Sequence, residues 1–173
     1  DQNNKVIYMS TFTKSLMPSL RVAYVVLPPQ LVPTYRNVFN YYSSTVPRFD
    51  QHILANFMRD GHFAKHLNRM RTIYRKKHDL LIEELQQYAP QVEVFGERAG
   101  MHLLIRLQHE ETEQQLIQRA LDAAIQLFTL KDYTFTPSES AAPTLLLGFG
   151  DLHERQIKNA VQALMTALHI TKS

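Results

Sequence analysis

The longest regular pattern in the chain is helical and runs from His62 to about Tyr88. Its apolar residues recur mostly at steps of three or four positions: Phe63, Leu67, Met70, Tyr74, Leu81, Leu85 and Tyr88. This spacing predicts one long amphipathic helix. Pro90 ends it, because proline cannot continue the hydrogen-bond ladder of a helix, and the chain changes character at that point.

Short apolar runs on both sides of the long helix predict strands. Before it they are residues 6–9 and 22–27, and after it 92–95, 101–105, 127–130 and 144–149. Further helices are predicted at 30–42, 47–59, 111–125, and from Asp151 as the N-cap to about Leu168. This alternation favours a layered α/β fold with an α+β part. The strands before Pro28 and those after Pro90 are expected in different sheets.

The composition excludes several classes of function. The chain has 173 residues, enough for one ordinary domain, and no cysteine, which removes disulfide scaffolds, thiolate zinc sites and iron–sulfur clusters. Its five glycines form no cluster after a predicted strand, so a Walker-type or dinucleotide-binding loop is not expected. No apolar run approaches the ~20 residues that span a bilayer. We expect a cytoplasmic protein and, because Asp1 stands where an initiator methionine would, a fragment of a longer chain.

The densest chemistry lies in residues 11–21, between two runs that are apolar at consecutive positions and are therefore predicted to be strands buried on both faces. A lysine near apolar walls and a second cation has a lowered pKa and becomes nucleophilic. An arginine flanked by hydroxyls can bind phosphate without glycines. Lys14 and Arg21 are the candidates for these roles, and the simpler alternative is a solvated loop with two surface cations.

The segment from Tyr8 to Tyr24, YMSTFTKSLMPSLRVAY, resembles the lysine segment of fold-type I pyridoxal-phosphate (PLP) enzymes. In particular it resembles the aminotransferase-like domain of MocR-type transcription regulators of the GntR family, whose usual pattern is G-T-F-S-K-x-L-x-P-x-L-R. Residues 51–74, 100–103 and 145–149 are similar to later parts of that domain. The resemblance implies the end of the large domain in residues 1–45. It places connecting helices and the C-terminal small domain of a fold-type I PLP-dependent aminotransferase in residues 46–173.

The resemblance implies roles for four residues. Lys14 would hold the cofactor aldehyde as an internal aldimine, and Arg21 would pair with the cofactor phosphate. The hydroxyls of Thr11 and Thr13 would donate hydrogen bonds near that phosphate. In this fold the phosphate loop, the ring-stacking aromatic residue and the aspartate for the pyridine nitrogen precede the lysine. We therefore expect them upstream of Asp1, and we expect the isolated chain to bind PLP poorly and to be inactive.

The substrate carboxylate site departs from the pattern of classical aminotransferases, which place an arginine in the small domain. The last predicted strand, Leu145 to Phe149, carries no arginine. In MocR-type relatives a basic residue can come from the region that here contains Asp132. Lys131 or Arg106 would then substitute for it.

The resemblance implies a MocR-type regulator that senses an amino compound by aldimine exchange at Lys14. The exchange would change the DNA affinity of a separate N-terminal winged-helix domain, and the full-length protein would be a homodimer. The alternative is a metabolic PLP-dependent aminotransferase of class I or II, which would use the same lysine and a dependable carboxylate arginine. Whether the parent protein catalyses transamination or only senses an amine stays open at this point.

A third interpretation treats Lys14 as incidental and rests on the cations of the long helix: Lys65, Arg69, Arg71, Arg75, Lys76 and Lys77. Such a stripe can contact nucleic-acid phosphates, but no base-reading element accompanies it, so a solvated helix face is favoured. His62 and His66 have a spacing that can bind zinc. No third ligand is evident, so no metal site is predicted. His102, in an apolar strand, is expected in the core.

Overall fold

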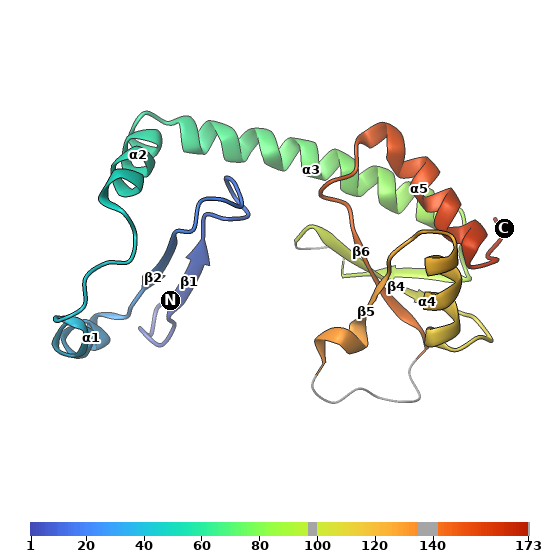
Figure 1. The fold of residues 1–173 in the computed structure, drawn as a ribbon, viewed down its shortest axis with the longest axis horizontal. Helices are drawn as coiled ribbons and strands as arrows, with labels where there is room; N and C mark the ends of the chain where they lie inside the picture. Colours follow the sequence, from blue (N-terminus) through green and yellow to red (C-terminus); the bar gives the residue numbers. More distant parts are fainter. Residues whose placement is uncertain (97–99, 135–141, 173) are drawn as a thin grey trace. The chain divides into compact units, whose positions relative to one another are not determined.

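The computed structural model describes residues 1–96, 100–134 and 142–172. The chain divides into two compact units, Asp1–Arg69 and Met70–Ser173. Each unit contains one sheet (Figure 1), which confirms that the early and late strands belong to different sheets. The division into 1–45 and 46–173 that the resemblance implies stays a prediction.

The first unit consists of a β-hairpin followed by short helices. Its elements are β1 (Tyr8–Thr11), β2 (Ala23–Val26), the 3₁₀ turn η1 (Pro29–Leu31), α1 (Val32–Phe39), α2 (Arg48–Arg59) and the start of α3 (His62–Gln86). The two strands pair antiparallel, with Tyr8 opposite Val26 and Thr11 opposite Ala23. The helix predicted for residues 30–42 is divided into η1 and α1 and ends at Phe39.

The faces of the β1–β2 hairpin are open in the described residues. All eight residues of the two strands are exposed, and Met9 is 80% exposed. The prediction that these strands are buried on both faces is therefore wrong for this structure. Consecutive apolar residues do favour a sheet covered on both sides, but here no described layer covers the hairpin.

The second unit is a four-stranded antiparallel sheet with helices. Its elements are the end of α3, β3 (Val92–Phe95), β4 (His102–Leu107), α4 (Glu113–Asp122), β5 (Phe128–Thr129), η2 (Leu130–Tyr133), β6 (Thr144–Gly148) and α5 (Glu154–Ala167). The strands are ordered β3-β4-β6-β5, and every neighbouring pair is antiparallel. This is the α+β part that the sequence predicts.

One face of this sheet and three helices form the core of the second unit. Leu103, Ile105 and Leu107 alternate along β4 and are fully buried, so they share one face of the strand. Helices α3, α4 and α5 cover that face with buried side chains that include Leu85, Leu116 and Met165. His102 is exposed on β4, so its expected place in the core is wrong. Residues 102, 104 and 106 alternate onto the opposite face.

The first residue of the last helix differs from the prediction. His153, not Asp151, is the N-cap of α5, because the backbone at His153 is still extended at ψ 146°. The His153 N–H donates to Oε1 of Gln156 over 3.1 Å, and this reciprocal contact is half of a capping box. The start of α5 is therefore set by the side-chain oxygen of Gln156, three residues after the N-cap, and not by an acidic N-cap residue.

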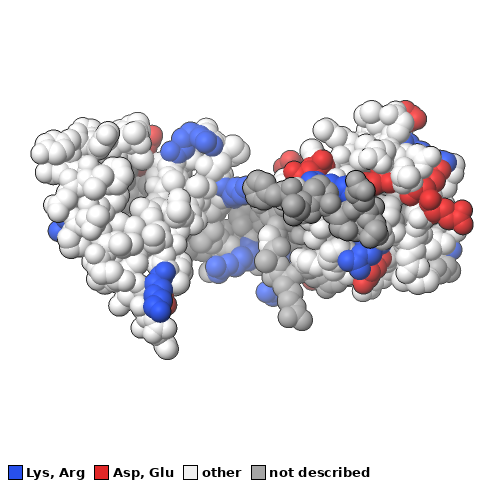
Figure 2. Space-filling model, turned by 90° about the horizontal axis from the view of Figure 1, so that it is seen from below, with Lys and Arg blue, Asp and Glu red and all other residues white. Residues whose placement is uncertain are grey.

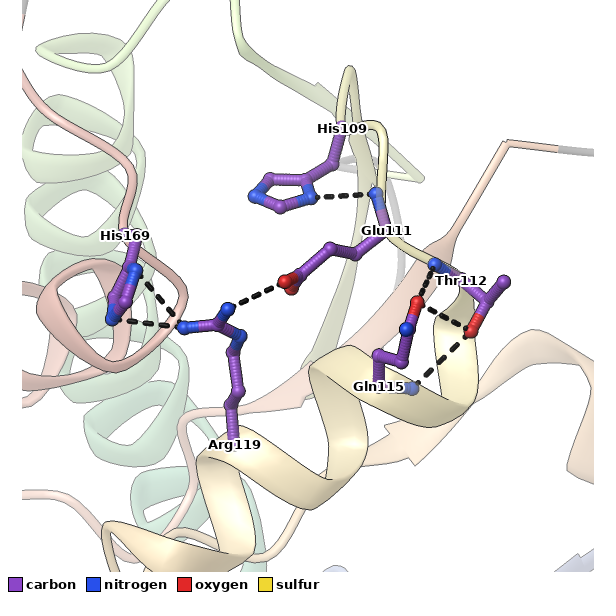
Figure 3. Close-up of polar contacts among 6 residues, drawn as sticks. All are labelled: His109, Glu111, Thr112, Gln115, Arg119 and His169. Carbon is purple, nitrogen blue, oxygen red and sulfur yellow. Dashed lines mark hydrogen bonds and ion pairs between the residues drawn. The ribbon is translucent and has the colours of Figure 1, made fainter.

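A polar cluster joins α4 to the end of α5 (Figure 3). The Arg119 guanidinium donates to a carboxylate oxygen of Glu111, and its Nη1 lies 2.9 Å from both ring nitrogens of His169. In the ring plane an atom at that distance from both nitrogens would overlap Cε1, so Nη1 lies over the imidazole face. His169 itself has a left-handed backbone, with φ 56°. Its N–H donates to the Thr166 carbonyl, which closes the helix end.

We predict that the Glu111 carboxylate makes the second unit less stable in acid. Its hydrogen bond from Arg119 holds the pKa of the Glu111 carboxyl below its ordinary value of 4.5, although partial burial opposes this. A lowered pKa in the folded state stabilises the protein above pH 4.5, and this contribution is lost as the pH falls through the folded-state pKa. Glu111→Gln should therefore lower the free energy of unfolding at pH 7.

Urea unfolding of both proteins between pH 7 and pH 3 measures this effect, and the difference between wild type and Glu111→Gln should shrink toward zero in acid. The control is Glu110→Gln, since Glu110 is an exposed neighbour. A difference that is constant with pH would contradict the assignment.

Candidate functional site

The loop between β1 and β2 has a fixed backbone that carries Lys14. The ladder of the hairpin continues into it, because the Phe12 N–H donates to the Val22 carbonyl over 3.0 Å. A tight turn follows, in which the Leu16 N–H donates to the Phe12 carbonyl over 2.9 Å. Lys14 stands within that turn, so a hydrogen-bonded backbone presents its side chain.

The structure brings the four predicted cofactor residues into one hairpin. Lys14 and Arg21 are both exposed in this loop, and Thr11 is exposed at the end of β1. Thr13 is half-buried, and its hydroxyl donates to the Leu20 carbonyl over 3.2 Å. That bond ties the residue before Lys14 to the residue before Arg21. The apolar walls expected around Lys14 are not supplied by the described residues.

Beneath the loop, Phe12 is buried among aromatic rings. Its ring centroid lies 5.4 Å from that of Tyr24 and 5.8 Å from that of Phe63, the latter in an edge-to-face arrangement. A cavity of about 460 Å³ adjoins these rings, and its lining is mostly apolar: Ser10, Thr11, Phe12, Ser15, Tyr24, Met58, Phe63 and Leu67. Packing between the hairpin and the helices of this unit is thus incomplete.

One contact at this loop was missed by the sequence reasoning. Nε2 of His66, in the second turn of α3, lies 3.0 Å from the backbone carbonyl of Ser15. The two residues are 51 positions apart, and no local pattern links them. In the sequence, His62 and His66 are marked only by a spacing that can bind zinc. His62 packs instead on the ring of Phe57, at 5.7 Å.

The two residues predicted to bind a substrate carboxylate are each paired with a carboxylate of the protein. Nζ of Lys131, in η2, lies 3.3 Å from Oε1 of Glu113, whose side chain is only 8% exposed. The Arg106 guanidinium, in β4, donates to Glu93 of β3 over 2.9 Å and lies over the ring of Phe95. Asp132 accepts from the N–H and hydroxyl of Thr129, so it caps η2.

The basic residues of α3 are unevenly exposed. Lys77 is half-buried and donates to the Gly150 carbonyl over 2.6 Å, whereas Lys65, Arg69, Arg75 and Lys76 are exposed. The first unit has eight Lys and Arg against three Asp, and the second has eleven against thirteen Asp and Glu. On the face in Figure 2 the acidic side chains accordingly gather on the second unit.

Two kinds of feature are absent from the part of the chain that the structure describes. Among residues 1–96, 100–134 and 142–172, no group of three His, Asp or Glu side chains could hold a metal ion. In the same part of the chain, no helix is long and apolar enough to cross a membrane.

Comparison with known sequences identifies relatives over almost the whole chain. The family model "Aminotransferase class I and II" matches residues 1–164. The chain is 38% identical to the uncharacterized HTH-type transcriptional regulator YhdI of Bacillus subtilis, over 96% of this chain and 35% of that protein. It is 28% identical to the probable rhizopine catabolism regulatory protein MocR of Rhizobium meliloti, over 96% and 34%. The chain thus spans about a third of the length of these curated relatives.

Solved structures of aminotransferases have the same fold. The α-aminoadipate aminotransferase LysN of Thermus thermophilus, complexed with N-(5'-phosphopyridoxyl)-L-leucine, matches with a TM-score of 0.78 and 25% identity, over 95% of this chain and 42% of that one. The multiple substrate aminotransferase of Thermococcus profundus matches with a TM-score of 0.82 and 22% identity, over 98% and 42%. The fold is therefore that of a part of these enzymes, about two fifths of their length.

We predict that Lys131 stabilises the second unit by neutralising Glu113. Lys131→Met should lower the free energy of unfolding by about 1–2 kcal/mol, because it leaves a buried carboxylate unpaired. The expected loss in the free energy of unfolding is smaller than for a fully buried ion pair, since the Lys131 side chain is 34% exposed. Adding Glu113→Gln to Lys131→Met should recover most of the loss. Chemical denaturation of the three variants measures it, and a double variant no more stable than Lys131→Met would refute the pairing.

Proposed function

Since the chain belongs to the class I and II aminotransferase family, we propose that it is the C-terminal part of a PLP-binding domain in a MocR-type regulator. Lys14 is the residue that holds the cofactor. The observation that carries the proposal is the loop between β1 and β2, where Lys14 and Arg21 are both exposed on a hydrogen-bonded backbone.

The side chains of this loop fit the chemical groups of PLP. When bound, PLP supplies an aldehyde that reacts reversibly with primary amines, and a phosphate group that needs hydrogen-bond donors. Lys14 offers the amine, and the planar guanidinium of Arg21 suits bidentate phosphate binding. Thr11 offers an exposed hydroxyl. Thr13 already donates its one hydroxyl proton to Leu20, so it can donate to the phosphate only if that bond breaks.

The relatives favour a regulator over a metabolic aminotransferase. Identity is 38% to YhdI, whose name describes an HTH-type transcriptional regulator, and 25% to the enzyme LysN. In the proposed full-length protein an amino compound competes with Lys14 for the cofactor and thereby changes DNA binding by an N-terminal domain. That protein is a cytoplasmic homodimer, and residues 1–45 form the end of its PLP-binding large domain.

The carboxylate of the amino compound has two candidate partners in this proposal. Lys131 and Arg106 are the cations, and each would have to leave the carboxylate of Glu113 or Glu93 to bind a ligand. The pairing of Lys131 is the harder to break, because Glu113 would be left buried. Arg106 is therefore the less costly partner.

The proposal predicts covalent trapping of PLP at Lys14. The full-length protein that contains this chain is incubated with PLP, reduced with borohydride, digested and analysed by mass spectrometry. We expect the adduct to be concentrated on the peptide that contains Lys14 and to be lost in Lys14→Arg. Arg21→Gln should lower its yield, because the phosphate loses its cation.

Lys65→Arg is the matched control, since it removes another exposed lysine of the same unit and should leave the yield unchanged. Adducts spread evenly over all lysines, with no effect of Lys14→Arg on the total, would refute a cofactor site at this loop.

A further inference from the structure

Both sides of Lys14 are held by the first two turns of α3. On one side, the buried ring of Phe12 contacts the ring of Phe63. On the other, the carbonyl of Ser15 lies 3.0 Å from Nε2 of His66. Phe63 and His66 are three residues apart, so they lie on one face of the helix. The turn that presents Lys14 is thus fixed at two points, one apolar and one polar.

The polar point has a defined donor. A carbonyl oxygen only accepts, so the proton of this hydrogen bond is on Nε2 of His66. The bond is also partly buried, which protects it from competition with water.

Packing alone does not immobilise the turn. Phe12, Ser15 and Phe63 all line the cavity of about 460 Å³ next to the hairpin, so this side of the turn is not closely packed. Apolar contacts are not directional, whereas a hydrogen bond fixes the position of one atom. The atom fixed here is the carbonyl oxygen of the residue that follows Lys14.

We propose that His66 is a positioning residue for Lys14: by donating to the Ser15 carbonyl it holds the turn in the conformation that presents the lysine amine to the cofactor. This inference rests on the proposed function of Lys14. His66 does not contact the reacting atoms, and it acts through the backbone of the turn.

The first test uses the chain without cofactor. Amide hydrogen exchange is followed in the peptide that contains Lys14 to Met17, whose Leu16 N–H closes the turn. His66→Ala should speed exchange there about fivefold, the factor expected for the loss of one hydrogen bond. His66→Gln should restore slow exchange, because a Gln amide can donate from about the same place as Nε2. His62→Ala is the matched control, since His62 packs on Phe57.

The second test uses PLP and borohydride at a subsaturating cofactor concentration. His66→Ala should lower the trapped yield at Lys14 about fivefold, and His66→Gln should recover it. Rescue by Gln separates positioning from general loss of structure, and a thermal melt of each variant confirms folding.

The two proposals fail in different ways. If the wild-type full-length protein forms no adduct at Lys14, the proposed function fails. If the wild type does form it and His66→Ala matches the wild type in exchange and yield, the positioning role is overturned and the proposed function stands. If His66→Gln behaves like His66→Ala in both experiments, the donated hydrogen bond is not the cause and the inference is also overturned.

Discussion

The antiparallel pairing of β1 with β2 is the interaction on which the candidate site depends. It brings the two ends of the loop together, and the bond from Phe12 to Val22 extends the ladder by one step. Residues 12–22 contain no glycine, so no residue with special backbone freedom sets the shape of the loop. Hydrogen bonds set it instead, from Thr13 to Leu20 and from His66 to Ser15.

In the second unit, two basic side chains form ion pairs with carboxylates of the protein itself. Lys131 neutralises the buried Glu113, and Arg119 serves both Glu111 and the end of α5. The Lys131–Glu113 pair joins η2 to α4, and the contact of Arg119 with His169 joins the C-terminal turn to α4. A ligand that bound Lys131 or Arg119 would break the contact that this side chain makes and would weaken the attachment of η2 or of the C-terminal turn to α4.

The sequence predicted most elements but few of the contacts between them. Helix α3 was predicted because apolar residues recur at helical spacing along its 25 residues. A pattern repeated over that length still indicates a helix where single positions depart from it. Asp151 was wrong as an N-cap because Gln156 supplies the acceptor from inside the helix. The contact of His66 with Ser15 could not be predicted, since it depends on how a loop and a helix 51 residues apart pack together.

The open hairpin also determines how this chain behaves in concentrated solution. A two-stranded sheet leaves an unpaired edge on each strand, and an unpaired edge is a template for another strand. Neither β1 nor β2 contains a charged residue that would oppose such pairing, and both present exposed apolar side chains such as Met9 and Val26. Strand addition at β1 or β2 is therefore a route open to copies of this chain, and covering those edges would close it.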